Sequence, residues 1–223
     1  VSIGGTVTQN LGNPSQKQWW GASVAYEASS GKAVLVWNAN PELMYSVWNG
    51  TSWSAAATIG NGAGTGTYTG TEPRQIRMAS NPKSNSNEIV LVVTDVNEVD
   101  RALVWNGTTW GNQVQLDSNT GHNFTDANVA YESQTGRAIV SYASGTTGAV
   151  GYRMWDGGSS TWSTAATVAV PASGTDGYAQ WTVLASDPKS NRIALGVQTS
   201  GQDSWMNVWS GTAWGTSTLG VSN

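Results

Sequence analysis

The chain has 223 residues, enough to bury the core of one all-β domain or of two smaller domains. Only 11% of its residues are charged and its net charge is −4, so it offers no positive surface for a phosphate backbone and we expect no nucleic-acid partner. It has no run of about 18 apolar residues, so we expect no membrane insertion, and without cysteine it can form neither disulfides nor cysteine-ligated metal sites.

The rest of the composition favours a location outside the cell. Hydroxyl and amide side chains supply most of the polar surface, and there are 13 tryptophans against one phenylalanine. This pattern is typical of extracellular or cell-surface proteins. The chain begins at Val1 rather than methionine, and residues 1–10 lack a signal-peptide pattern, so we interpret it as a mature or excised product.

The first predicted element is a strand over residues 5–12. Its sequence resembles residues 112–117 and 216–220, which end later repeats. It is therefore a surplus strand beside four complete units, and an unpaired strand edge is a template for another chain. Either the chain was cut from a longer array, or this strand pairs with a neighbouring subunit in a filament or oligomer.

Four tandem units of four short strands follow, over approximately residues 13–60, 61–117, 118–170 and 171–220. The predicted strands are 23–27, 33–37, 43–48 and 53–59 in the first unit; 76–80, 89–94, 101–105 and 110–116 in the second; 128–132, 138–143, 149–155 and 162–168 in the third; 181–186, 192–198, 205–209 and 214–219 in the fourth. Turn residues separate them, which predicts antiparallel up-and-down meanders without helices. The second strand of each unit is the most continuously apolar, so we expect it to lie between neighbouring sheets.

The units also alternate in pairs. The first and third share the pairs Tyr26-Glu27 and Tyr131-Glu132, which we interpret as the end of a first strand meeting its turn. The second and fourth share "ASNPKSN" (79–85) and "ASDPKSN" (185–191). The larger period is about 105 residues, as though a two-unit piece had been duplicated.

A tryptophan-bearing hairpin closes the outer strands of every unit. Its eight tryptophans are Trp48, Trp53, Trp105, Trp110, Trp155, Trp162, Trp209 and Trp214. The Asn49-Gly50 pair predicts a two-residue type I′ turn, which places the two rings of its hairpin as diagonal neighbours on one face. We interpret these rings as clips that join the outer strands and cover the neighbouring unit, not as ligand contacts.

Four-stranded meanders repeated at about 50 residues resemble the blades of a β-propeller, over nearly the whole chain. By motif they resemble the sialidase-type propellers, whose Asp-box hairpin reads Ser-x-Asp-x-Gly-x-Thr-Trp. Asp156, Gly158 and Trp162 come nearest to this box, with Trp162 six residues after Asp156 where the box has five. The expected fold is a single all-β domain over residues 1–223, a β-propeller of four tandem four-stranded blades with an extra N-terminal strand.

The sialidase resemblance implies an arginine triad, a nucleophilic tyrosine with a glutamate partner, and an acid–base aspartate. The candidate arginines are Arg74, Arg77, Arg101, Arg137, Arg153 and Arg192. Arg137 and Arg192 are predicted at turns into second strands, and Arg101 and Arg153 on third strands, so they do not converge on one end. No sequence feature identifies a carboxylate of raised pKa for acid–base chemistry, and we expect no enzymatic activity.

The predicted ligand site is one rim of the repeats, where the connections between units and the loops between second and third strands differ from unit to unit. The candidate ligand-binding residues are Trp19, Trp20, Tyr68, His122, Phe124, Tyr178, Trp181, Glu42 and Asp203. Aromatic faces stack on sugar rings, and carboxylates accept hydrogen bonds from hydroxyl groups, so we expect a glycan there. The alternative is that the aromatic residues seal the ends of the units.

Residues 95–100 (DVNEVD) bring Asp95, Glu98 and Asp100 into one loop, a candidate calcium site. The segment lacks the glycine and regular oxygen spacing of a dedicated calcium loop, which favours a solvated turn. We expect no other cofactor.

These features predict an extracellular, non-enzymatic binding or adhesion module that recognises a glycan or another cell-surface ligand. One alternative is a structural subunit of an extracellular filament or oligomer that assembles by strand pairing. Another is a sialidase-like glycosidase or a fragment of one.

Overall fold

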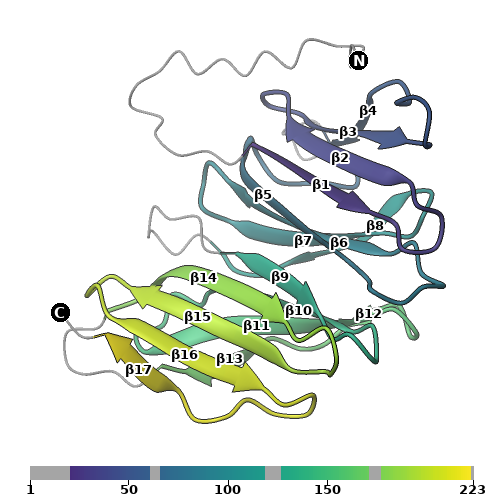
Figure 1. Cartoon of the computed structure of the whole chain (residues 1–223). Helices are drawn as coiled ribbons and strands as arrows, with labels where there is room; N and C mark the ends of the chain where they lie inside the picture. Colours follow the sequence, from purple (N-terminus) through teal and green to yellow (C-terminus); the bar gives the residue numbers. More distant parts are fainter. Residues whose placement is uncertain (1–20, 61–65, 119–126, 171–176, 222–223) are drawn as a thin grey trace.

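The computed structural model of the chain describes residues 21–60, 66–118, 127–170 and 177–221 (Figure 1). All of its regular elements are strands, and they form four antiparallel sheets. Sheet 1 contains β1 (Ala22–Tyr26), β2 (Ala33–Asn38), β3 (Leu43–Trp48) and β4 (Ala57–Gly60). Sheet 2 contains β5 (Pro73–Ser80), β6 (Ile89–Asp95), β7 (Asp100–Trp105) and β8 (Trp110–Gln115). Sheet 3 contains β9 (Asn128–Tyr131), β10 (Ala138–Ala143), β11 (Ala149–Asp156), β12 (Thr161–Trp162) and β13 (Ala166–Ala169). Sheet 4 contains β14 (Ala179–Ser186), β15 (Ile193–Thr199), β16 (Ser204–Trp209) and β17 (Thr218–Val221).

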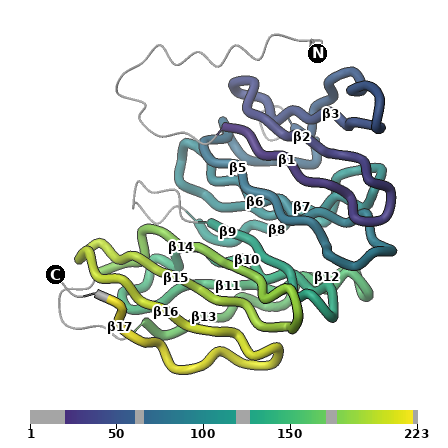
Figure 2. Tube along the Cα trace, in the orientation of Figure 1, coloured from purple at the N-terminus to yellow at the C-terminus, as the bar shows by residue number. Residues whose placement is uncertain are grey.

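Each sheet is an up-and-down meander, as predicted, because strands that follow one another in the sequence pair with one another. Sheet 3 differs only in its fourth strand, which is split into β12 and β13, both paired with β11. The chain passes through the sheets in sequence order, from purple to yellow (Figure 2). In the part that the structure describes, no helix is long and apolar enough to span a membrane.

The sheets stack face to face in a row, with one apolar core between each neighbouring pair. β6 and β10 are buried along their whole length because each has a sheet on both sides. β15 instead alternates between buried and exposed residues, since sheet 4 has a neighbour on one face only. The predicted burial of the second strands is therefore confirmed for the two middle sheets.

The row is open. Sheet 1 and sheet 4 lie at its opposite ends (Figure 1), and each leaves apolar side chains in solvent. Tyr26 of sheet 1 is 62% exposed, and Val183 and Met206 of sheet 4 are 57% and 54% exposed. The four predicted sheets are present, but they form a propeller-like row and not a closed ring.

The two tryptophan rings of each hairpin pack against each other, but the predicted register of the hairpins is wrong. Trp48 pairs directly with Trp53 across a four-residue loop, and their ring centroids lie 5.7 Å apart. The backbone of Asn49 is not in the left-handed conformation that a type I′ turn requires. Its side-chain Oδ1 instead accepts hydrogen bonds from the backbone N–H groups of Thr51 (2.9 Å) and Ser52 (3.0 Å). Only Gly50 has a positive φ, of 101°. A side-chain cap therefore replaces the two-residue turn that Asn-Gly predicts.

One hydrogen bond recurs between each pair of neighbouring sheets. The indole N–H of the first hairpin tryptophan donates to a buried or half-buried glutamate of the preceding sheet, a contact that we call the latch. The latches are Trp105 to Glu27 (2.6 Å), Trp155 to Glu88 (2.9 Å) and Trp209 to Glu132 (2.5 Å). Each one satisfies an indole donor inside an apolar interface, where an unpaired donor would be costly.

Candidate ligand-binding site

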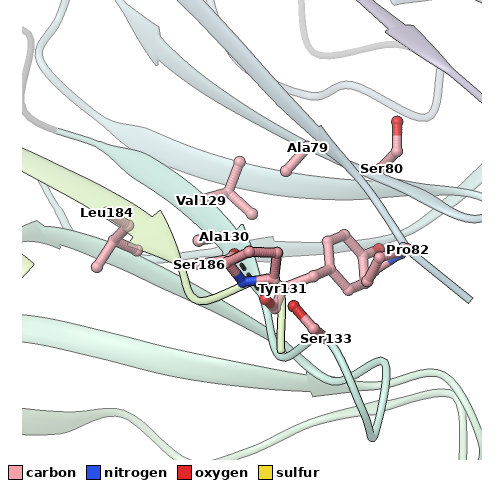
Figure 3. Close-up of a pocket in the computed structure, with 10 residues that line it drawn as sticks. Ala79, Ser80, Pro82, Val129, Ala130, Tyr131, Ser133, Leu184 and Ser186 are labelled. Carbon is pink, nitrogen blue, oxygen red and sulfur yellow. Dashed lines mark hydrogen bonds between the residues drawn. The ribbon is translucent and has the colours of Figure 1, made fainter. Parts of the chain in front are cut away.

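A pocket opens where the first strands of sheets 2, 3 and 4 end, and we call it the serine pocket (Figure 3). Its volume is about 430 Å³, within the range of small-molecule sites. Its lining residues are Ala79, Ser80, Pro82, Val129, Ala130, Tyr131, Ser133, Leu184, Ser186 and Pro188. Three consecutive sheets thus contribute to one site.

The shared Ala-Ser-Asn/Asp-Pro motif forms two walls of this pocket. In sheet 2 the Oδ1 atom of Asn81 accepts from the backbone N–H of Lys83 (3.1 Å), and in sheet 4 Asp187 accepts in the same way from Lys189 (2.9 Å). These side-chain caps hold the turns that follow β5 and β14. The end of β9 lies between the two turns and supplies Tyr131 and Ser133.

Two serine hydroxyls tie the pocket together across sheets 3 and 4. Ser186 Oγ donates to the carbonyl oxygen of Tyr131 (2.6 Å, dashed in Figure 3), and Ser133 Oγ donates to the carbonyl oxygen of Asp187 (2.6 Å). A hydroxyl has a single proton to donate. Both groups therefore meet a ligand as acceptors, which suits a ligand that brings its own hydroxyl donors.

Tyr131 forms part of the pocket wall but holds its own hydroxyl inside the protein. Its side chain is buried, and its hydroxyl donates to Glu88 Oε1 at 3.0 Å. Burial, followed by the negative charge of Glu88, raises the pKa of the Tyr131 hydroxyl well above its ordinary value. Tyr131 is thus a neutral apolar wall at neutral pH and not an activated nucleophile.

The rest of the lining is apolar or neutral. Val129, Leu184 and the two prolines Pro82 and Pro188 present aliphatic surface, and Ser80 adds a hydroxyl at the edge. Tyr131 is the only titratable lining residue, so the lining contains no pair of groups for general acid–base catalysis. This arrangement can bind a neutral, hydroxyl-bearing ligand.

Four residues of the predicted rim, Trp19, Trp20, His122 and Phe124, lie outside the described residues, as does the predicted strand over 5–12. The other five are not gathered into one site. Glu42 lies in the loop between β2 and β3 of sheet 1, at the opposite end of the row from sheet 4 (Figure 1). Tyr178, Trp181 and Asp203 belong to sheet 4 or its loops.

Two of these rim candidates are buried. Tyr68 is fully buried, and its hydroxyl donates to the carbonyl oxygen of Thr71 at 3.0 Å. Asp203 is 4% exposed, and its carbonyl oxygen accepts from the backbone N–H of Thr199 at 2.9 Å. For Tyr68 the alternative interpretation, an aromatic residue that seals the end of a unit, describes its position. Tyr178 is exposed, whereas Trp181 and Glu42 are half-buried.

Two acidic side chains of the loop over residues 95–100, those of Asp95 and Asp100, have partners within the protein. Within the described ranges, no group of three or more acidic or histidine side chains is arranged to hold a metal ion. Asp95 accepts from the backbone N–H groups of Asn97 (2.9 Å) and Val99 (3.1 Å) and forms a 2.8 Å ion pair with Arg101. Asp100 accepts from Thr94 Oγ1 at 2.5 Å. Asp95 and Asp100 are buried and hold their loop together, whereas Glu98 is half-buried and Asn97 is exposed.

Asp117 lies at the edge of this acidic group and accepts from the backbone N–H of Asp100 at 2.7 Å. Burial first, and then the charge of Asp100, raises the pKa of Asp117 to about 8. At neutral pH this side chain is therefore largely protonated. It is not part of the serine pocket.

Three of the six candidate arginines have partners within the protein. Arg101 binds Asp95, Arg137 binds Glu132 at 2.8 Å, and Arg153 donates to the carbonyl oxygen of Ser163 at 2.9 Å. In the hairpin nearest to an Asp box, Asp156 Oδ1 accepts from the backbone N–H of Gly158 at 2.9 Å. This contact caps the hairpin turn, as Asn49 does in the first unit.

The sequence contained one signal for the serine pocket. The motif repeated at 79–85 and 185–191 forms two walls of the pocket. It makes a pocket only because β9 lies between β5 and β14, and no local sequence pattern predicts that arrangement of the sheets. The pocket also lies at the end of the turns between first and second strands, opposite to the predicted rim.

No protein-family model and no curated protein sequence matches the chain. Solved lectin structures do resemble it. The SapL1 lectin in complex with α-methyl fucoside matches with a TM-score of 0.56 and 15% identity, covering 92% of this chain and 64% of that one. The fucose-specific lectin from Aleuria aurantia matches with a TM-score of 0.53 and 14% identity, covering 91% and 61%. The BP39L lectin from Burkholderia pseudomallei matches with a TM-score of 0.59 and 8% identity, covering 90% and 55%. The chain thus spans about 55–64% of the length of these proteins, and the likeness shows a common β-propeller-like fold.

Proposed function

We propose that the chain is a non-enzymatic carbohydrate-binding module and that the serine pocket is its ligand site. The observation that carries the proposal is the lining of the pocket: hydroxyl acceptors of Ser133 and Ser186 beside the aliphatic surface of Val129 and Leu184. A sugar combines hydroxyl donors with apolar C–H faces, and so matches both parts of this lining.

The similar lectin structures support this assignment, because the SapL1 and Aleuria aurantia proteins are described as fucoside-bound and fucose-specific. We place the module outside the cell, where its low charge and its polar surface are common. Its partners there are glycans of a cell surface.

A glycan array probed with the 223-residue chain tests the function, and titration calorimetry with the best glycan tests the site. Ser80→Trp puts an indole at the half-buried edge of the pocket. We expect it to weaken binding at least about tenfold by steric exclusion. Trp181→Ala and Tyr178→Ala alter the predicted rim and serve as matched controls that retain affinity.

Three results would contradict the proposal. A chain that binds no glycan on the array has a different function. Loss of affinity in the rim variants, with Ser80→Trp unaffected, moves the site to the rim. Turnover of fluorogenic sialosides or other glycosides shows that the chain is an enzyme.

A further inference from the structure

The two free ends of the row carry the two halves of the latch. In sheet 3, Tyr131 and Trp155 pair across the same residue, Ala138, and both donate to Glu88 of sheet 2. In sheet 1, Tyr26 and Trp48 pair in the same way across Ala33. These two donors face the side of sheet 1 that has no neighbour within the described residues, and Tyr26 is 62% exposed where Tyr131 is 2% exposed.

The acceptor half lies at the other end, in sheet 4. Asp187 follows the first strand of its sheet, as Glu27 and Glu132 do in sheets 1 and 3. Its Oδ2 accepts from the hydroxyl three residues later, Ser190 Oγ, at 2.6 Å. Glu27 and Glu132 accept from the hydroxyls of Ser30 and Thr135 at the same spacing. Asp187 therefore has the local structure of a latch acceptor and no indole donor from the described chain.

Apolar surface surrounds both halves. On the free face of sheet 4, Val183, Gly196 and Met206 are direct cross-strand partners, and Ala194 and Val208 form the next row. On the free face of sheet 1, Val24 pairs with Leu35, and Trp37 pairs with Met44. Directly paired residues share a face of a sheet. Each of the two outer sheets thus has an apolar free face. The donor half of the latch on sheet 1 and the acceptor half on sheet 4 lie at corresponding ends of their strands.

We propose that two copies of the chain associate head to tail. The free face of sheet 1 of one copy packs on the free face of sheet 4 of the next, and Trp48 donates to Asp187 across the contact. This contact continues the interface that the chain builds three times internally, with the same donor and an apolar surround. Its acceptor lies where Glu27 and Glu132 lie in two of those three contacts, directly after the first strand, whereas Glu88 in the other precedes β6. It buries apolar faces that water would otherwise surround.

Such a contact is heterologous, because it joins two different surfaces. Repeating it leads to a closed ring or an open filament, whereas a symmetric dimer would use one surface twice. The contact joins sheet faces, and so it differs from the pairing through the edge of residues 5–12 that the sequence predicts.

Two surface substitutions separate these possibilities. Tyr26→Lys charges the face of sheet 1, and Met206→Lys charges the face of sheet 4. Both side chains are more than half exposed, so the fold is retained, as far-UV circular dichroism checks. In sedimentation equilibrium we expect the unmodified chain to exceed 23.4 kDa with rising concentration. Each variant alone stays at 23.4 kDa, because each lacks one of the two faces. An equimolar mixture forms a dimer of twice that mass, through the two unaltered faces.

An unmodified chain that stays monomeric at high concentration overturns the proposal and leaves the faces to some other partner. A single variant that still dimerises overturns it too, since it shows a symmetric contact. The latch is tested by Trp48→Phe, which keeps an aromatic ring without the N–H group. We expect the dissociation constant to rise about tenfold, the change for one hydrogen bond to a carboxylate. Adding Asp187→Ala to the Trp48→Phe chain should not raise the dissociation constant further. If the effects of the two substitutions are additive, Trp48 and Asp187 do not form a hydrogen bond with each other.

Discussion

The indole Nε1 of Trp105 donates a 2.6 Å hydrogen bond to Oε1 of Glu27, which lies 78 residues earlier on the neighbouring sheet. Both side chains are almost completely buried. The hydrogen bond replaces the water that would otherwise solvate both the carboxylate and the indole N–H group, and so it allows the two sheets to pack together. Because it joins two defined atoms, it also fixes the position of one sheet relative to the other.

Trp105→Phe should therefore destabilise the chain far more than Trp48→Phe. Removing the indole N–H from Trp105 leaves Glu27 with Ser30 as its remaining partner, and we expect a loss of at least about 2 kcal/mol in the free energy of unfolding. Trp48 is half-buried at the open end, and its substitution should cost less than about 1 kcal/mol.

Urea unfolding followed by far-UV circular dichroism measures both variants. The comparison is made at low protein concentration, because association through the face of Trp48 would add stability. Equal losses in the two variants would show that the latch contributes little beyond ring packing.

Glycines in the hairpin loops give a second matched pair. Gly50 and Gly107 have φ values of 101° and 98°, which an alanine adopts only under strain. A Cβ at Gly50 would meet nothing within 4 Å, whereas at Gly107 it would lie 2.9 Å from the Cβ of Asn87. We expect Gly50→Ala to cost about 1–2 kcal/mol and Gly107→Ala clearly more, measured as thermal unfolding by calorimetry. If the midpoints of thermal unfolding of the two variants fall by the same amount, the side chain of Asn87 moves aside without a loss of stability.

The sequence predicts those features of the fold that depend on short local patterns of residues. The strands and their order follow from short apolar runs between turn residues, and β5 to β8 lie close to their predicted ranges. The register of the hairpins was missed because Asn49 serves as a side-chain acceptor, a choice that the Asn-Gly pair does not reveal. Glu27 was predicted at the end of its strand, but its partner Trp105 depends on how two sheets stack.

The candidate site was predicted less well, for the same reason. The serine pocket forms only where β5, β9 and β14 converge, and two of the residues bonded across it, Tyr131 and Ser186, are 55 residues apart in the sequence. Tyr68 lies in a connection between sheets, where aromatic residues serve equally well as ligand contacts or as core. Its ring is fully buried in the core between sheets 1 and 2, and its hydroxyl lies so close to Gly70 that an added Cβ there would be 2.2 Å from it.

Tyr68→Ala and Tyr178→Ala distinguish core from rim. Tyr68 packs in the core between sheets 1 and 2, and its loss should reduce the free energy of unfolding by about 3–5 kcal/mol, the usual cost of a large buried ring. Tyr178 is exposed, and its substitution should change stability by less than about 0.5 kcal/mol. Chemical unfolding measures both effects. A small effect at Tyr68 would mean that its ring is free to leave the core and meet a ligand.

Asp117 predicts an unusual dependence of stability on pH. The folded chain holds the proton of Asp117 up to a pKa of about 8, whereas an aspartate in the unfolded chain loses its proton near pH 4. Between these values only the unfolded state ionises at this residue, so the contribution of Asp117 to the free energy of unfolding falls as pH rises from about 4 to 8. The fall is at most about 1.4 kcal/mol per pH unit. Asp117→Asn removes the ionisation and keeps an oxygen that accepts from the backbone N–H of Asp100.

We therefore expect Asp117→Asn to match the unmodified chain at pH 4 and to be more stable at pH 8, with the difference growing steadily between them. Urea midpoints measured at each pH unit give this difference directly, and the other carboxylates cancel because both proteins contain them. Asp156→Asn, in an exposed hairpin turn, makes the same change of side chain outside this acidic group and is the matched control. A constant difference across the range would mean that Asp117 is ionised in the folded chain, with water reaching its carboxylate beside Asp100.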